Sequence, residues 1–148
     1  MKIEDVLQTK NFVDERHKMV VNIKYTASWI NQIYAKKMGE YNISLQQFNV
    51  LRILRGAKSK LKVQQVRERM LEKSPNITRL MDKMEKADLL KRFQCKDDRR
   101  AILVEITEKG LDLLAELDKE FPLMNSFYKN ITEEDAKTMN EILDRLRE

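Results

Sequence analysis

Residues 74–110 read SPNITRLMDKMEKADLLKRFQCKDDRRAILVEITEKG, and this stretch decides the fold. Apolar residues in its first half recur at the three- and four-residue spacing of an amphipathic helix: Ile77, Leu80, Met81 and Met84. Ser74 is predicted to cap this helix, with Pro75 in the first helical position. After Leu89 the period changes to two, in two alternating segments that four charged residues join. The stretch therefore predicts a capped helix followed by a β-hairpin with a charged tip.

The face of this helix opposite the apolar stripe is polar and largely basic. On a helical wheel it holds Pro75, Arg79, Asp82, Lys83 and Lys86, with Asn76 and Thr78 at its margins. The DNA major groove admits an α-helix, and Arg79 is the central candidate for a base or phosphate contact. Asp82 would repel phosphate, so we expect it to pair with Arg79 or Lys86 along the helix. The alternative is an ordinary solvated helix face.

Three helices are predicted before this stretch. The first covers residues 12–38 and ends at Gly39. The second covers residues 44–55, begins with a capping box at Ser44 and ends at Gly56. The third is short and is marked by Val63, Val66 and Met70.

Two further helices are predicted after the hairpin. Thr107 caps a long helix that Pro122 bends or breaks, and the last helix follows Thr132. The helices outside the quoted stretch carry more apolar residues than one stripe needs, among them Trp29, Ile33, Leu143 and Leu146. This excess predicts a homodimer, unless the same residues are covered within the monomer.

The net charge of +5 is unevenly distributed along the chain. Residues 1–57 carry nine Lys and Arg against five Asp and Glu, and residues 58–110 carry fifteen against nine. Residues 111–148 reverse the sign, with five against ten. A basic centre with an acidic end is typical of a protein that binds a polyanion through one region. Charged helices that only need solvated faces are the alternative.

Several classes of protein are disfavoured by composition. A phosphate-binding loop needs glycines closer together than the three present, Gly39, Gly56 and Gly110. One histidine (His17) and one cysteine (Cys95) cannot build a metal cage, a disulfide or a thiol–imidazole pair in the monomer. The longest apolar run, residues 101–104, is too short for a membrane span or a signal peptide. We therefore expect a cytoplasmic protein that is no enzyme and has no cofactor, metal or membrane partner.

The segments SPNITRLMDKMEKADLLKR and KDDRRAILVEITEKG resemble the multiple-antibiotic-resistance regulator (MarR) family of bacterial transcription factors. With the flanking helices in matching order, the resemblance extends over nearly the whole chain. It implies a mainly α fold with a small β-wing, in a single domain of residues 1–148. Residues 44–110 would form a winged helix-turn-helix lobe, and residues 1–40 and 111–148 a helical dimerisation region. The chain departs from the family at Asp88, where glycine is common, so this Asp should adopt a left-handed conformation.

The resemblance also implies a function. Members are homodimers that usually repress transcription by binding pseudo-palindromic operators on double-stranded DNA, and small, often aromatic, effectors release many of them. Arg100 would be the wing arginine in the minor groove, with Asp98 orienting it by a salt bridge. The residues expected to contact DNA are Ser74, Asn76, Thr78, Arg79, Lys83, Lys86, Asp98, Arg99 and Arg100.

Other readings stay open beside this one. A non-specific or architectural nucleic-acid binder and a helical protein-interaction module are the alternative functions. Redox sensors of the family use a cysteine in the first helix, which this chain lacks, so Cys95 is expected to be a small buried hydrophobe. Tyr25, Trp29 and Tyr34 either belong to the core and dimer interface or line an effector pocket beside the DNA-binding lobe.

Overall fold

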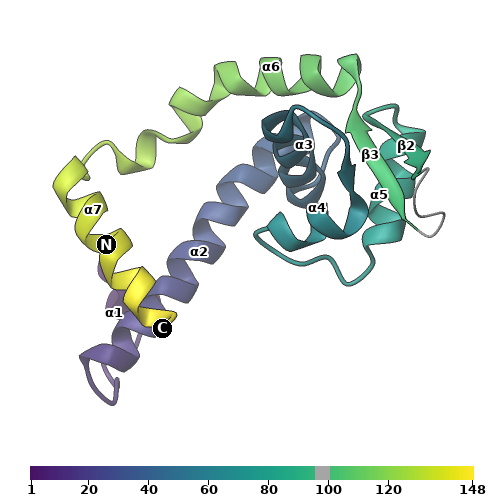
Figure 1. Cartoon of the computed structure of the whole chain (residues 1–148). Coiled ribbons are helices and arrows are strands. Elements are labelled where there is room, and N and C mark those ends of the chain that lie inside the picture. The colour runs from purple at the N-terminus through teal and green to yellow at the C-terminus, as the bar shows by residue number, and fades with distance from the viewer. Residues whose placement is uncertain (96–100) are drawn as a thin grey trace.

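The computed structural model describes residues 1–95 and 101–148, which form a compact lobe and long helical arms (Figure 1). The lobe contains α3 (Leu45–Ala57), β1 (Leu61–Lys62), α4 (Val63–Arg69), α5 (Ile77–Lys86), β2 (Leu90–Gln94) and β3 (Ile102–Ile106). The rest of the chain forms α1 (Ile3–Val6), α2 (Glu15–Glu40), α6 (Glu108–Met124), the short 3-10 helix η1 (Ser126–Tyr128) and α7 (Glu133–Leu146). Both chain ends lie away from the lobe. The predicted fold class, mainly α with a small β-wing, is confirmed.

The long first helix, α2, begins and ends later than predicted. Asp14 caps it, because its carboxylate accepts a hydrogen bond of 2.7 Å from the His17 backbone N–H. The helix then continues through Gly39, so the predicted stop there was wrong. The chain turns instead at Asn42, which has a left-handed φ of 57°. Asparagine tolerates this conformation better than most residues.

The second helix, α3, shows the same pattern. The predicted capping box is present, with the Ser44 side chain accepting from Gln47 N–H and the Gln47 side chain accepting from Ser44 N–H. Gly56 lies inside the helix, which was predicted to end there, and the left-handed residue is Lys58, with φ 52°. Gly39 and Gly56 both keep a negative φ and remain helical, and a Cβ at either position would meet no neighbour within 4 Å.

The predicted hairpin is present as part of a small antiparallel sheet. The strand order is β1-β3-β2, and in the hairpin Arg92 lies opposite Val104. Strand β1 was not predicted, because two residues are too few to show a period. Asp88, in the turn before β2, has φ 57°, as expected for the residue that replaces a family glycine.

The helices after the hairpin follow the predicted caps. Thr107 caps α6 through the Gly110 N–H, and Thr132 forms a capping box with Asp135 at the start of α7. Helix α6 does not break at Pro122 but continues for two more residues. The short elements α1 and η1 were not predicted, since each spans only about one turn.

The core lies in the lobe and at the first half of α6. Its fully buried side chains include Val50, Leu51, Val66, Met84, Leu90, Val104, Leu114 and Leu117. In contrast, Met38 is the one buried residue of α2, and α7 has none. Helices α2 and α7 therefore contribute little to this core, although α2 has other contacts within the monomer, such as Trp29 against Phe127 with ring centroids 5.4 Å apart.

Candidate nucleic-acid interface

Helix α5 is the first part of the candidate interface, and its start differs from the prediction. Its cap is Asn76, whose side-chain oxygen accepts a hydrogen bond of 3.0 Å from the Arg79 N–H. Ser74 precedes the helix and is buried, with 5% of its surface exposed, so its predicted role as the cap was wrong. Asparagine and serine cap helices about equally well. Because Pro75 and Asn76 form a turn, the helix begins after them, and Asn76 is the residue in the capping position.

The two faces of α5 are divided as predicted. Leu80, Met81 and Met84 are buried in the core, and Ile77 is half-buried beside them. The opposite side exposes Thr78, Arg79, Lys83 and Lys86, as well as the capping Asn76. Among the described residues, no carboxylate forms an ion pair with any of the three basic side chains. These cations are therefore available to an external anion.

Asp82 is not tied to a neighbour on its own helix, which corrects the prediction. It accepts a hydrogen bond of 2.6 Å from Nη1 of Arg92, a residue of strand β2. Glu85 binds the same guanidinium, with Nε donating to Oε2 at 2.8 Å and Nη2 donating to that oxygen as well. The guanidinium lowers the pKa of Glu85, and the two carboxylates raise the pKa of Arg92. We call Asp82, Glu85 and Arg92 the helix–wing triad.

The wing is the second part of the interface. Asp98, Arg99 and Arg100, the predicted minor-groove residues, lie outside the described residues. The hairpin ladder reaches as far as Cys95, whose N–H donates to the Ala101 carbonyl at 3.0 Å. Cys95 itself is half-buried, so it is less enclosed than predicted.

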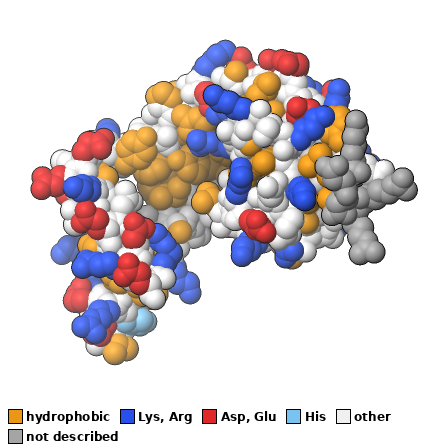
Figure 2. Space-filling model, in the orientation of Figure 1, with side chains coloured by type: hydrophobic (Ala, Val, Ile, Leu, Met, Phe, Trp, Pro, Cys, Tyr) orange, Lys and Arg blue, Asp and Glu red, His pale blue; other side chains and the backbone are white. Residues whose placement is uncertain are grey.

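A cleft that the sequence did not reveal connects the two parts. It has a volume of about 420 Å³ and lies between the start of α4, helix α5 and the hairpin. Its polar lining residues are Lys62, Gln64, Thr78 and Arg92. The spacing of Asp82 and Glu85 places both carboxylates on one side of α5, but it does not point to Arg92 on strand β2 as their partner. Figure 2 shows further Lys and Arg side chains spread over the lobe.

Comparison with known proteins agrees with this geometry. Residues 43–102 match the model of the MarR family. The HTH-type transcriptional regulator MhqR of Bacillus subtilis (strain 168) is 30% identical over 118 residues, or 79% of this chain and 81% of MhqR. The chain belongs to the MarR family. The HTH-type transcriptional regulator MgrA of Staphylococcus aureus is 26% identical over a stretch of the same length. Since these relatives are transcriptional regulators, the MarR assignment also supports the prediction that the chain is no enzyme.

Solved structures of transcriptional regulators share the fold. A mutant MarR from E. coli complexed with operator DNA has a TM-score of 0.79 at 18% identity, covering 93% of this chain and 99% of that one. The organohalide-sensing regulator RdhR in its 2,4-dichlorophenol-bound form also has a TM-score of 0.79, at 19% identity. It covers 91% of this chain and 80% of its own.

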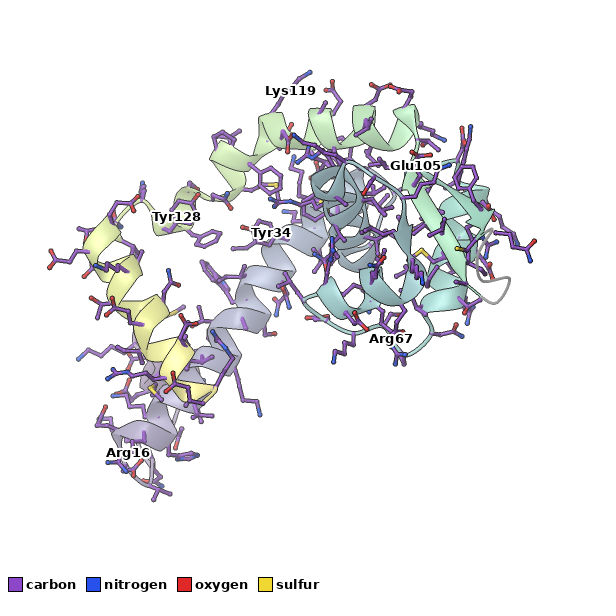
Figure 3. The ribbon with its side chains drawn as sticks, in the orientation of Figure 1. Arg16, Tyr34, Arg67, Glu105, Lys119 and Tyr128 are labelled. Atoms are coloured by element: carbon purple, nitrogen blue, oxygen red, sulfur yellow. The ribbon has the colours of Figure 1, made fainter. Side chains whose placement is uncertain are left out.

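A second hollow of this MarR-family chain lies between the lobe and the arms. It has a volume of about 580 Å³, and its walls come from α2, α3, α6 and the loop after α4. Arg52 stacks over the rings of Phe48 and Phe121 in this hollow, 5.8 and 5.6 Å from their centroids. Tyr34 also lines it and donates a hydrogen bond to Asn125, and burial raises the pKa of this tyrosine. Figure 3 shows Tyr34 on α2, between the lobe and the arms. Figure 2 shows hydrophobic side chains gathered in this region.

The described part of the MarR-family chain has neither a helix fit to span a membrane nor a cluster of potential metal ligands. No helix there is long and apolar enough to cross a membrane. No three His, Cys, Asp or Glu side chains of residues 1–95 and 101–148 are placed to hold a metal ion.

Proposed function

We propose that this MarR-family regulator is a sequence-specific repressor that binds DNA as a homodimer. Helix α5 enters the major groove, where Arg79 contacts a base edge and Lys83 and Lys86 bind phosphates. Arg100 of the wing enters the minor groove, oriented by Asp98. The observation that carries the proposal is the exposed basic face of α5, whose cations have no carboxylate partner among the described residues. Operator DNA in a bacterium is cytoplasmic, so the proposal also assigns the protein to the cytoplasm.

The arms support the dimer. Trp29 on α2 is 39% exposed, and Met139 and Leu146 on α7 are 53% and 49% exposed. Exposed apolar side chains of this kind favour an apolar partner, and a second copy of the same helices would provide one. Two-fold symmetry would then present two α5 helices about 34 Å apart, which is one turn of DNA.

The hollow between the lobe and the arms supports an effector. Aromatic and aliphatic side chains line it beside the stacked guanidinium of Arg52, and its other polar wall residues include Asn31, Gln46, Asn49, Arg69 and Glu72. This combination suits a small aromatic molecule with a polar group. Its wall includes Leu71 and Glu72, in the loop between α4 and α5. Asn31 of α2 donates to Glu72 at 3.1 Å, so a ligand that separates the two would displace the loop before α5. We propose that this displacement releases DNA.

Selection of bound sequences from random duplex DNA tests the DNA-binding part. A specific regulator yields an inverted repeat. A bound pool without a consensus would instead support a non-specific or architectural binder, and no bound pool would support a protein-interaction module.

Release by small aromatics tests the effector part. We expect 2,4-dichlorophenol and a panel of substituted phenols and benzoates to include a compound that releases the selected operator. Ile30→Trp fills the hollow and should abolish this release while leaving operator affinity unchanged. Release that persists in Ile30→Trp would place the effector elsewhere.

A further inference from the structure

We propose that Arg92 is a positioning residue for DNA binding: it offsets one of the two negative charges of Asp82 and Glu85 on α5 and fixes the hairpin to that helix. The inference rests on the proposed DNA-binding function. It assigns a role to Arg92, a strand residue that pairs with two carboxylates of the protein itself. An arginine beside a DNA-binding helix would ordinarily bind a phosphate.

The triad uses three of the five N–H groups of the guanidinium, one from each nitrogen. Nε and Nη2 of Arg92 bind Oε2 of Glu85, and Nη1 binds Asp82. The Arg92 backbone N–H also donates to Oε1 of Glu85, at 3.3 Å. The arginine side chain is 27% exposed, whereas the carboxylates are 44% and 39% exposed. Each nitrogen of the Arg92 guanidinium therefore has a carboxylate partner, and the two acids are more exposed than the arginine.

The charge of the triad matters because Asp82 lies among the DNA-facing residues of α5. Arg79, Lys83 and Lys86 surround it on that side of the helix. Two uncompensated carboxylates there would repel phosphate, and like charges across an interface weaken binding strongly. With Arg92 in place, the triad carries a single net negative charge instead of two.

The geometry of the triad fixes one element relative to the other. Asp82 and Glu85 lie one turn apart on α5, and Arg92 lies opposite the buried Val104 in the middle of the hairpin. A planar guanidinium that binds two carboxylates resists rotation between the elements that carry them. The triad therefore sets the angle between α5 and the hairpin, and that angle decides whether both elements reach their grooves together.

The test compares Arg92→Gln with Lys91→Gln, which removes the same charge from the neighbouring, exposed strand residue. Operator affinity is measured for the matched operator and for one with a mismatched base pair, at several salt concentrations. We expect Arg92→Gln to lose about tenfold or more in affinity and most of its discrimination, while Lys91→Gln changes affinity by less than about threefold. The salt slope of Arg92→Gln should equal that of the wild type, because Arg92 releases no counterion from DNA.

Two further variants separate charge from position. Arg92→Lys keeps the charge but loses the planar fork, so it should retain non-specific affinity and lose discrimination. Adding Asp82→Asn and Glu85→Gln to Arg92→Gln should restore non-specific affinity but not discrimination. If Arg92→Gln does not fold, as judged by its thermal transition, Arg92→Lys carries the comparison.

Two results would overturn the inference. One is a salt slope for Arg92→Gln that is lower by about one unit per protomer, which would make Arg92 a direct phosphate ligand. The other is wild-type discrimination in both Arg92 variants. Failure of the wild type itself to select any operator would instead contradict the proposed function.

Discussion

Arg79 is the residue on which sequence preference should depend most. Its N–H is held by the cap at Asn76, and its side chain projects from the first turn of α5 into solvent. A bidentate arginine–guanine contact contributes about 1–3 kcal/mol of discrimination. Arg79→Ala should therefore weaken binding and bring matched and mismatched operators closer together in titrations.

Arg147→Ala is the matched control, since it removes an exposed arginine from the end of the chain, beyond α7. It should change neither affinity nor preference. Equal discrimination by Arg79→Ala and the wild type would mean that Arg79 contacts only phosphate.

The Glu85 carboxyl should make the stability of the protein depend on pH. Arg92 lowers its pKa in the folded protein below the ordinary value of 4.5. The ion pair therefore stabilises the fold above pH 4.5 and is lost as the pH falls through the lower, folded-state pKa. Glu85→Gln should be less stable than the wild type in urea unfolding at pH 7, and the difference should shrink at a second, acidic pH well below 4.5. A constant difference at both pH values would show that Glu85 contributes by packing alone.

At the scale of elements, the sequence correctly predicted those elements whose hydrophobic pattern repeats several times. The apolar stripe of α5 and the alternating hairpin were both right, because each repeats its period several times. The ends of α2 and α3 were wrong, because a glycine permits a turn without requiring one. The partner of Asp82 was wrong for a different reason: spacing along one helix cannot reveal that Arg92, on another element, lies within reach. Strand β1 was missed because it exists only through its pairing with β3.

Gly110 provides a prediction about the packing of α6 against the hairpin. A Cβ added at Gly110 would lie 2.6 Å from the Leu89 carbonyl oxygen and 2.7 Å from Cγ1 of Ile106, where α6 starts against the hairpin. Gly110→Ala should thus destabilise the fold by about 1–3 kcal/mol, since the contact is partly with backbone. Urea unfolding at pH 7 measures this change.

Gly39→Ala is the matched control, because nothing lies within 4 Å of a Cβ at that helical position. It should leave stability unchanged or raise it by about 0.5–1 kcal/mol. A Gly110→Ala protein as stable as the wild type would show that α6 shifts freely against the hairpin.

At the scale of the whole molecule, the open arrangement of the arms predicts a dimer. Light scattering at micromolar concentration should give about twice the chain mass of 17.7 kDa. Leu146→Glu places a charge on the exposed apolar face of α7 and should shift the mass toward the monomer. Leu71→Glu, at a leucine that is 90% exposed outside the arms, should not. A monomeric wild type would leave the apolar faces of the arms unexplained.

The spacing of the selected operator tests the central claim most directly. Two α5 helices related by two-fold symmetry should read half-sites whose centres lie about 10–10.5 base pairs apart. Inserting about five base pairs between the half-sites turns one of them to the opposite side of the duplex, so a dimer can no longer reach both. We predict that affinity, measured by titration at fixed salt, then falls to the level of unrelated DNA, and that inserting a full turn leaves it similarly weak. An affinity that does not change with the half-turn insertion would contradict the account.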